Sequence, residues 1–250
     1  MNHKQAIKHN IYKIIAQSSE ELKVESYVIG GFVRDYLLER GTATDIDIVA
    51  VGSGIELAKQ VSKNLPNSPK VQIFKTYGTA MLLYDAIEIE FVGARKESYN
   101  EDSRNPVVEN GTLEDDQNRR DFTINALALS LDKQNFGELL DPFKGISDLN
   151  KGIIRTPLNP DITYNDDPLR MMRAIRFATQ LNFTIEEQSL SSITKNADRI
   201  KIITKERIVD ELHKIIAAPV PSIGFTLLHE TGLLPLLLPE LTDLEGIDEK

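Results

Sequence analysis

Two aspartates, Asp45 and Asp47, are the residues of this sequence that are best placed for chemistry. They are two positions apart in a run typical of a β-strand (DIDIVAV, residues 45–51), so both side chains leave the same face of the strand. Neighbouring carboxylates repel each other, and a hard divalent cation such as Mg²⁺ relieves that repulsion. Mn²⁺ would also fit oxygen ligands. The pair therefore predicts a metal site, and the alternative interpretation is a solvated strand face that carries acids.

A third carboxylate on a neighbouring strand would complete a two-metal site. Glu88 and Glu90 are also two apart in a predicted strand, and spacing alone does not choose between them. In phosphoryl-type transfer, one metal ion lowers the pKa of the attacking hydroxyl and the other neutralises charge on the triphosphate and the leaving group. The acids together therefore indicate transfer chemistry on a phosphate ester.

The glycine pair Gly30-Gly31 stands between a predicted strand (24–29) and a predicted helix (33–39). A glycine backbone can approach a triphosphate closely, and a helix N-terminus favours an anion. Arg34, one turn into the helix, could add a two-pronged contact to a phosphate. The order strand, turn, helix, strand predicts triphosphate contacts beside the metal ligands, whereas a simple tight turn is the plain alternative.

The elements that must position these residues follow from the spacing of apolar side chains. The predicted strands are 24–29, 45–51, 71–74, 80–84 and 87–93, and the predicted helices of the same region are 4–17, 33–39, 55–64 and 123–131. Residues 95–118 are polar and predict a long loop, and from about residue 160 onwards only helical spacing remains. The expected fold class is α+β: a head with a small mixed β-sheet and flanking helices over residues 1–155, followed by an all-helical neck over residues 156–250.

Composition excludes several classes of protein. The 250 residues include 41% hydrophobic and 27% charged residues, as in an ordinary globular protein. The lack of cysteine excludes disulfides and cysteine-bound zinc and favours a cytoplasmic location. The longest apolar stretch, residues 233–241, is too short to span a membrane. The net charge of −9 is unusual for a protein that binds nucleic acid, but binding depends on where the charge lies, and the arginines and lysines cluster.

Five motifs resemble, in order, those of bacterial tRNA CCA-adding enzymes and their poly(A) polymerase relatives, one class of the nucleotidyltransferase superfamily. The motifs are GGFVRD (30–35) with DID (45–47), RRDFTINA (119–126), DPFKG (141–145) with Asp148-Leu149, DDPLR (166–170), and ERI (206–208) with Glu211-Leu212. Together they cover residues from about 24 to 216. The resemblance implies a catalytic head and neck that add C and A from CTP and ATP to the 3′ end of tRNA, with Mg²⁺ and without a nucleic-acid template.

The resemblance also implies roles for individual residues. Glu90 lies five residues before Arg95, where such enzymes place their third carboxylate, so Glu90 is preferred to Glu88 as the partner of Asp45 and Asp47. The three are the expected catalytic residues, and the two aspartates are the expected metal ligands.

Further positions match nucleotide-binding residues of the family. Arg120 and Asp121 match residues that sense the ribose 2′-hydroxyl and so select NTP over dNTP. Arg170, Arg173 and Arg176 match arginines that line the nucleotide pocket. Without the resemblance, the arginine stripe would be interpreted as a solvated helix face.

Asp167 and Arg170 have a physical interpretation of their own. They are three apart at a predicted helix start and so share a face. A carboxylate only accepts hydrogen bonds and a guanidinium only donates them, which complements the donor-beside-acceptor edges of cytosine and adenine and mismatches those of guanine and uracil. The pair would act as the template, whereas an Asp cap followed by Pro168 is an ordinary helix start.

Several alternatives stay open on this evidence. A poly(A) polymerase, or an enzyme that adds only CC or only A, would share all five motifs. A small-molecule nucleotidyltransferase would need only the two aspartates, and a non-catalytic RNA- or nucleotide-binding module is a further alternative. Relatives continue well past residue 250, so we expect this chain to be a piece of a longer protein. Asp141 and Asp148 are expected to serve turns and caps, and Glu206 and Arg207 to be structural.

Overall fold

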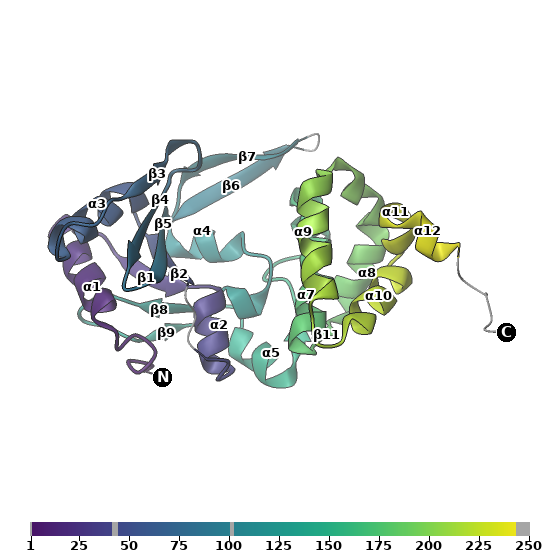
Figure 1. The fold of residues 1–250 in the computed structure, drawn as a ribbon, viewed down its shortest axis with the longest axis horizontal. Coiled ribbons are helices and arrows are strands. Elements are labelled where there is room, and N and C mark those ends of the chain that lie inside the picture. Colours follow the sequence, from purple (N-terminus) through teal and green to yellow (C-terminus); the bar gives the residue numbers. More distant parts are fainter. Residues whose placement is uncertain (1, 42–44, 101–102, 244–250) are drawn as a thin grey trace. The chain divides into compact units, whose positions relative to one another are not determined.

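A computed structural model of the chain describes residues 2–41, 45–100 and 103–243 (Figure 1). The chain divides into two compact units, one made of residues 1–98 with 106–146 and the other of residues 99–105 with 147–250. No helix of the described ranges is long and apolar enough to cross a membrane. The α+β class that the sequence predicts is confirmed by a mixed sheet in the first unit and a helical second unit.

The first unit is built on a seven-stranded sheet in the order β3-β4-β5-β2-β1-β8-β9. The strands are β1 (Ser26–Ile29), β2 (Asp45–Ala50), β3 (Gln72–Phe74), β4 (Thr79–Tyr84), β5 (Ile87–Gly93), β8 (Ala128–Ser130) and β9 (Leu139–Leu140). Its helices are α1 (Asn10–Leu22), α2 (Gly31–Leu37), α3 (Gly54–Asn64) and α4 (Leu113–Asn118). Strands β2 and β5 run parallel, and the other described neighbours run antiparallel.

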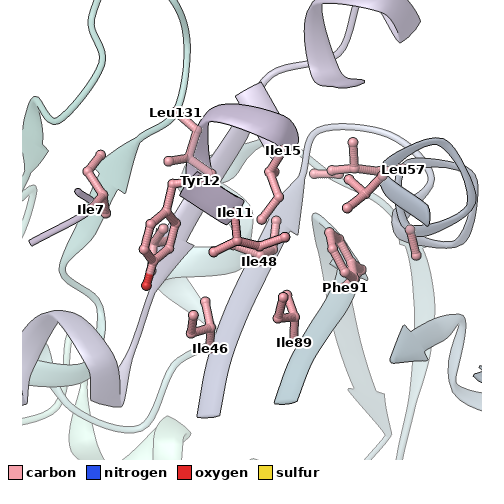
Figure 2. Close-up of a cluster of buried hydrophobic side chains, with 14 of the residues drawn as sticks. Ile7, Ile11, Tyr12, Ile15, Ile46, Ile48, Leu57, Ile89, Phe91 and Leu131 are labelled. Atoms are coloured by element: carbon pink, nitrogen blue, oxygen red, sulfur yellow. The ribbon is translucent and has the colours of Figure 1, made fainter. Parts of the chain in front are cut away.

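One face of this sheet carries the main core of the unit. Ile46 and Ile48 of β2 and Phe91 of β5 pack with Ile11 of α1 and Leu57 of α3 (Figure 2). Residues of a strand alternate between faces, so the apolar members of β2 commit Asp45 and Asp47 to the opposite face. The burial of β2 follows this alternation at its start, and the strand becomes fully buried toward Ala50. The core therefore determines which way the acids point.

Three sequence-based expectations for the first unit differ from the structure. The helix predicted over residues 4–17 is α1, which begins only at Asn10 and ends at Leu22. The predicted helix 123–131 is a short 3₁₀ turn (Thr123–Asn125) followed by strand β8. Strand β8 lies between β1 and β9 and is fully buried, so apolar residues occupy both of its faces and mimic a buried helix. The predicted loop 95–118 contains strands β6 (Arg95–Asn100) and β7 (Ser103–Asn110) and helix α4, while its residues 101–102 lie outside the described ranges.

The second unit is helical apart from the short parallel pair β10 (Ile153–Ile154) and β11 (Thr184–Ile185). Its helices are α6 (Pro160–Asp166), α7 (Leu169–Leu181), α8 (Glu187–Asn196), the 3₁₀ segment Ala197–Ile202, α9 (Lys205–Ile216), α10 (Pro221–Glu230), α11 (Leu234–Leu237) and α12 (Pro239–Thr242). Helix α5 (Gly145–Lys151) crosses the division between the units. Helix α7 is largely buried and contacts α9 and α10, so it forms the centre of this unit.

Candidate active site

The carboxylates of the site come from the parallel pair β2 and β5. The register places Asp47 opposite Glu90 and Asp45 opposite Glu88, so the four acids share the face that lies away from α1 and α3. Asp45 is exposed and Asp47 is half-buried. The register thus brings one glutamate beside each aspartate, and the preference for Glu90 over Glu88 that the resemblance implied stays a prediction.

The electrostatics of these acids favour a bound cation. Burial raises the pKa of Asp47, and although Arg120 opposes this, the carboxylates of Asp45 and Asp116 raise it further. Burial and the nearby Asp47 also raise the pKa of Glu90, against a hydrogen bond from Thr79 that lowers it. Acids that destabilise one another's charged forms are relieved by a divalent ion. The site thus combines negative charge with partial burial.

The carboxylates fit a Mg²⁺ ion that is coordinated partly by the protein and partly by the phosphates of a substrate. Within the described ranges, no group of three or more His, Cys, Asp or Glu side chains is arranged to hold an ion by itself. Mg²⁺ is commonly bound through one or two carboxylates together with substrate phosphates and water. Asp45 and Asp47 supply such a pair, and their oxygen ligands suit a hard cation.

At Gly30 the backbone passes close to one of these acids, Asp47. Its φ is +86°, and its N–H donates to the Leu127 carbonyl at 3.3 Å. A Cβ at this position would lie 3.1 Å from Nη1 of Arg120 and 3.4 Å from Oδ2 of Asp47. A glycine is therefore required both by the conformation and by the space. Gly31 follows as the first residue of α2. The glycine turn thus lies beside the Arg120 guanidinium, which can bind a phosphate, and beside the Asp47 carboxylate.

Arg34 is buried and contacts other protein groups. Its Nε and Nη2 donate to the two oxygens of Asp35, each at 2.8 Å, and its Nη1 donates to Oδ1 of Asn125 at 2.8 Å. Asn125 in turn donates to Oδ1 of Asp121 at 3.0 Å, and the Phe122 N–H donates to the same oxygen at 2.8 Å. Arg34 therefore orients Asp121 through Asn125. The triphosphate contact that the sequence suggested for Arg34 stays a prediction.

Arg120 is held by a residue that the sequence analysis missed. Asp116 of α4 is fully buried and accepts from Arg119 and Arg120. The i, i+3 and i, i+4 spacing of DDQNRR is the signal for these pairs, but the polar composition of the segment predicts a loop, in which that spacing has no meaning. Asp116 belongs to the site because its charge acts on Asp47 and its side chain binds Arg120.

In the second unit, Asp167 lies just before α7. Its Oδ1 accepts from the Leu169 N–H at 3.2 Å, as in an ordinary helix start, and its Oδ2 accepts from Nη2 of Arg207 at 3.2 Å. Arg170 lies in the first turn of α7, and its Nη1 donates to the Thr163 carbonyl at 3.4 Å. Both Asp167 and Arg170 are half-buried, which leaves part of each side chain accessible to a ligand.

Arg176 has a structural environment that the sequence did not indicate. It is 8% exposed, its Nε forms an ion pair with Glu211 of α9, and its guanidinium lies 3.8 Å from the centroid of the Phe177 ring. Arg173 lies 5.5 Å from the same ring. Because Arg176 links α7 to α9, the structure gives it a packing partner within the protein. Its predicted place in the nucleotide pocket stays a prediction.

Of the remaining motif residues, Asp141 has the expected capping role, whereas Asp148 has an ion-pair partner. Asp141 accepts from the N–H groups of Gly145 and Ile146 at 2.6 and 3.0 Å and so caps α5. Asp148 forms an ion pair with Arg155. Arg207 pairs with Asp167 and thereby connects the last motif to the one before it.

Comparison with known proteins gives two family matches. Residues 26–155 match the family described as "Poly A polymerase head domain". Residues 182–245 match the family described as "Probable RNA and SrmB- binding site of polymerase A". The first match covers the glycine turn, the carboxylates and Arg120, and the second covers α8 to α12.

Individual relatives agree with these matches. A CCA-adding enzyme of Geobacillus sp. (strain WCH70) is 38% identical over 93% of this chain and 55% of its own length. An A-adding tRNA nucleotidyltransferase of Aquifex aeolicus (strain VF5) is 37% identical over 76% of this chain and 23% of its own length. The solved structure of the Thermotoga maritima CCA-adding enzyme complexed with tRNA_CCA superposes with a TM-score of 0.83 at 30% identity, over 96% of this chain and 56% of that one. The chain spans about half the length of the two CCA-adding enzymes above and of further curated relatives of the same name.

Proposed function

Because the chain belongs to the Poly A polymerase head domain family, we propose that it is the catalytic part of a nucleotidyltransferase that adds C and A, from CTP and ATP, to tRNA 3′ ends. The observation that carries this proposal is the placement of Asp45, Asp47 and Glu90 on one sheet face, with Gly30 and Arg120 against Asp47. That set of groups fits a nucleoside triphosphate and a divalent ion.

Asp45 and Asp47 would hold Mg²⁺, which supplies activation of the attacking 3′-hydroxyl and neutralises charge on the triphosphate. Mn²⁺ is an acceptable substitute for oxygen ligands. Glu90 adds a third negative charge beside Asp47. The Gly30 backbone permits close approach of a phosphate, and Arg120 offers a positive charge at the same place. Asp121, oriented by Asn125, would accept a hydrogen bond from the ribose 2′-hydroxyl, and Arg120 would donate one to it.

Base choice is proposed to reside in Asp167 and Arg170. The carboxylate accepts from the exocyclic amino group of C or A, and the guanidinium donates to the adjacent ring nitrogen. G or U would leave polar groups unpaired, at a cost of about 1–3 kcal/mol each. Arg207 supports this role because it binds one oxygen of Asp167 and thereby limits its orientation. Arg173 and Arg176 complete the proposed arginine lining.

At the level of domains, we propose that residues 1–155 form the head and residues 156–250 the neck; the head-domain match supports that boundary, whereas the compact units divide earlier, between residues 146 and 147. Substrate RNA in the form of tRNA also favours a cytoplasmic location. These assignments concern a chain that spans about half of its relatives, and the protein tested should therefore include any longer natural form.

Incorporation of each NTP tests the proposal. The 250-residue chain and a longer natural form are given tRNA that ends at the discriminator base, Mg²⁺, and the four NTPs singly and together. Two C followed by one A, with no U or G, is the expected product. A long A ladder would show a poly(A) polymerase, and inactivity of both forms would favour a non-catalytic nucleotide- or RNA-binding module.

A second candidate is addition of A alone, which is favoured by the 37% identity with an A-adding relative. The same assay separates the two. A chain that adds only A would leave tRNA unextended with CTP, and would add a single A to tRNA that already ends in CC.

A further inference from the structure

The best-supported feature outside the expected residues is the carboxylate of Asp116, which lies fully buried in α4. Its two oxygens are divided between two arginines. Oδ1 accepts from Arg119, with Nε at 3.0 Å, and Oδ2 accepts from Nε and Nη2 of Arg120 at 3.2 and 3.1 Å. A buried carboxylate can stay ionised only where charged or polar groups bind its oxygens, as the two arginines do here.

The contact with Arg120 is side-on, through the Nε and Nη2 edge of the guanidinium. A guanidinium is a rigid planar fork, so fixing one edge also fixes the direction of the remaining nitrogen. That nitrogen, Nη1, lies 3.1 Å from the position of a Cβ on Gly30, and Oδ2 of Asp47 lies 3.4 Å from the same point. The location of Asp116 therefore determines where Arg120 meets the glycine turn.

We propose that Asp116 is a positioning residue that holds the Arg120 guanidinium at the Gly30 turn, where Arg120 binds the phosphates of the incoming nucleotide. This inference rests on the proposed function, and it adds Asp116 as the residue that orients the Arg120 side chain. Asp116 itself touches no substrate. Arg119, held by the other oxygen, keeps the Asp116 carboxylate from rotating away.

Helix α4 carries its own control for this inference. Asp115 is adjacent to Asp116, but its side chain faces the start of the helix, where it accepts from the Thr112 N–H at 2.9 Å in a capping box. Asp115→Asn weakens the cap and leaves the arginines in place. Asp116→Asn keeps the shape of the side chain but turns one acceptor into a donor that faces an arginine.

The test compares these variants by CTP binding with Mg²⁺ and by incorporation of C into tRNA. Asp116→Asn should lower kcat/KM and raise the Kd for CTP by about 10–100-fold, as is typical when a residue supporting a site is lost. Asp115→Asn should stay close to the parent in both measurements. Equal effects of the two variants would show that Asp116 acts only through the stability of α4, and would overturn the inference.

A double-mutant cycle identifies the arginine through which Asp116 acts. In an Arg120→Ala background, Asp116→Asn should cause little further loss, whereas in an Arg119→Ala background most of its effect should remain. If the losses from Asp116→Asn and Arg120→Ala simply multiply, the two residues act independently and the inference fails.

If Asp116→Asn does not fold, the variant Arg120→Lys is measured in its place. It keeps the charge and the Asp116–Arg119 pair but removes the fork, so the loss of CTP affinity should persist, and unchanged affinity would overturn the inference. A parent chain that binds CTP without extending tRNA would refute the proposed function while the Kd series still decides the role of Asp116. A parent chain that neither binds CTP nor extends tRNA would refute both.

Discussion

Gly30 sets how closely the backbone approaches Arg120 and Asp47. Its φ of +86° and ψ of −137° lie in a region that side chains rarely occupy, with a cost of about 1–3 kcal/mol for another residue. Gly30→Ala should therefore lower stability and also displace Arg120 Nη1, which reduces kcat/KM for C addition by about 100-fold. Gly41→Ala is the matched control, because Gly41 has φ +95° but nothing within 4 Å of its Cβ position. Equal activity loss in both variants would contradict a local role of Gly30.

The roles of the two glutamates of β5 can also be distinguished by a pair of variants. Glu90 lies beside Asp47 and Glu88 lies beside Asp45, on the same face of the sheet. Glu90→Gln should reduce nucleotide transfer by about 10–100-fold, because it removes a charge next to the metal ligands. Glu88→Gln should leave transfer within a few-fold of the parent, as measured by steady-state C incorporation. The reverse order would move the third carboxylate to Glu88.

At the scale of single residues, the sequence predicts the acids of the candidate site but does not predict the buried partners of its arginines. Asp45 and Asp47 could be predicted because their alternation with Ile46 and Ile48 is a local pattern. Asp116 could not be assigned because its role depends on full burial, which in turn depends on the surrounding sheet and helix. The position of Arg34 shortly after the glycine pair predicts a phosphate contact, whereas its observed contact with Asn125 joins residues 91 positions apart in the sequence and has no local signal.

The helices of the second unit depend on a buried ion pair between α7 and α9. The side chains of Arg176 and Glu211 are 10% and 4% exposed, so loss of Glu211 removes the charged partner of a buried guanidinium, which keeps its hydrogen bond to Gln180 and its contact with the Phe177 ring. Glu211→Ala should lower the unfolding free energy by about 3–5 kcal/mol. Asp210→Ala, on the same helix but exposed, should change it by less than about 0.5 kcal/mol. Denaturant unfolding measures both, and similar values for the two would show that the pair contributes little.

Helices α6 and α8 are linked by Asp161, which contacts Lys195 and Ser192. The hydrogen bond from Lys195, followed by that from Ser192, lowers the pKa of Asp161. Since the folded-state pKa lies below the unfolded one, the stabilisation is present above the ordinary aspartate range and is lost as pH falls through the folded pKa. Unfolding measured between neutral and acid pH should show a smaller pH dependence in Asp161→Asn. An unchanged slope would exclude Asp161 as a contributor.

Helices and strands whose own residues show a periodic apolar pattern could be predicted. Strands that are recognisable only from the strands beside them could not. The strand around Asp45 and the one around Glu90 show alternation or an apolar run between turn signals. Strand β8 is buried between two others, so its composition does not distinguish a strand from a helix. Strands β6 and β7 are polar and pair with each other, which leaves no apolar alternation to detect.

At the scale of the whole molecule, the proposed binding of Mg²⁺ by Asp45 and Asp47 predicts a change in the stability of the folded chain. A ligand that binds only the folded state stabilises it by about 2.7 kcal/mol at 100 times its Kd. Mg²⁺ should therefore raise the Tm of the parent chain, and Asp47→Asn should abolish that increase. Glu88→Gln should retain it, because Glu88 is not an expected ligand. A Tm increase that survives in Asp47→Asn would place the ion elsewhere.

The parallel pairing of β2 with β5 also has a consequence for folding kinetics. Parallel strands cannot be joined by a tight turn, and here the chain passes through α3, β3 and β4 before β5 returns beside β2. Contacts between residues far apart in sequence form after local ones, because a large loop must close first. The β4–β5 hairpin and α1 can form early, whereas Asp47 and Glu90 meet only when the crossover is complete. During refolding, cation affinity should therefore appear after most of the helical signal, and during synthesis it should appear only once Gly93 has left the ribosome.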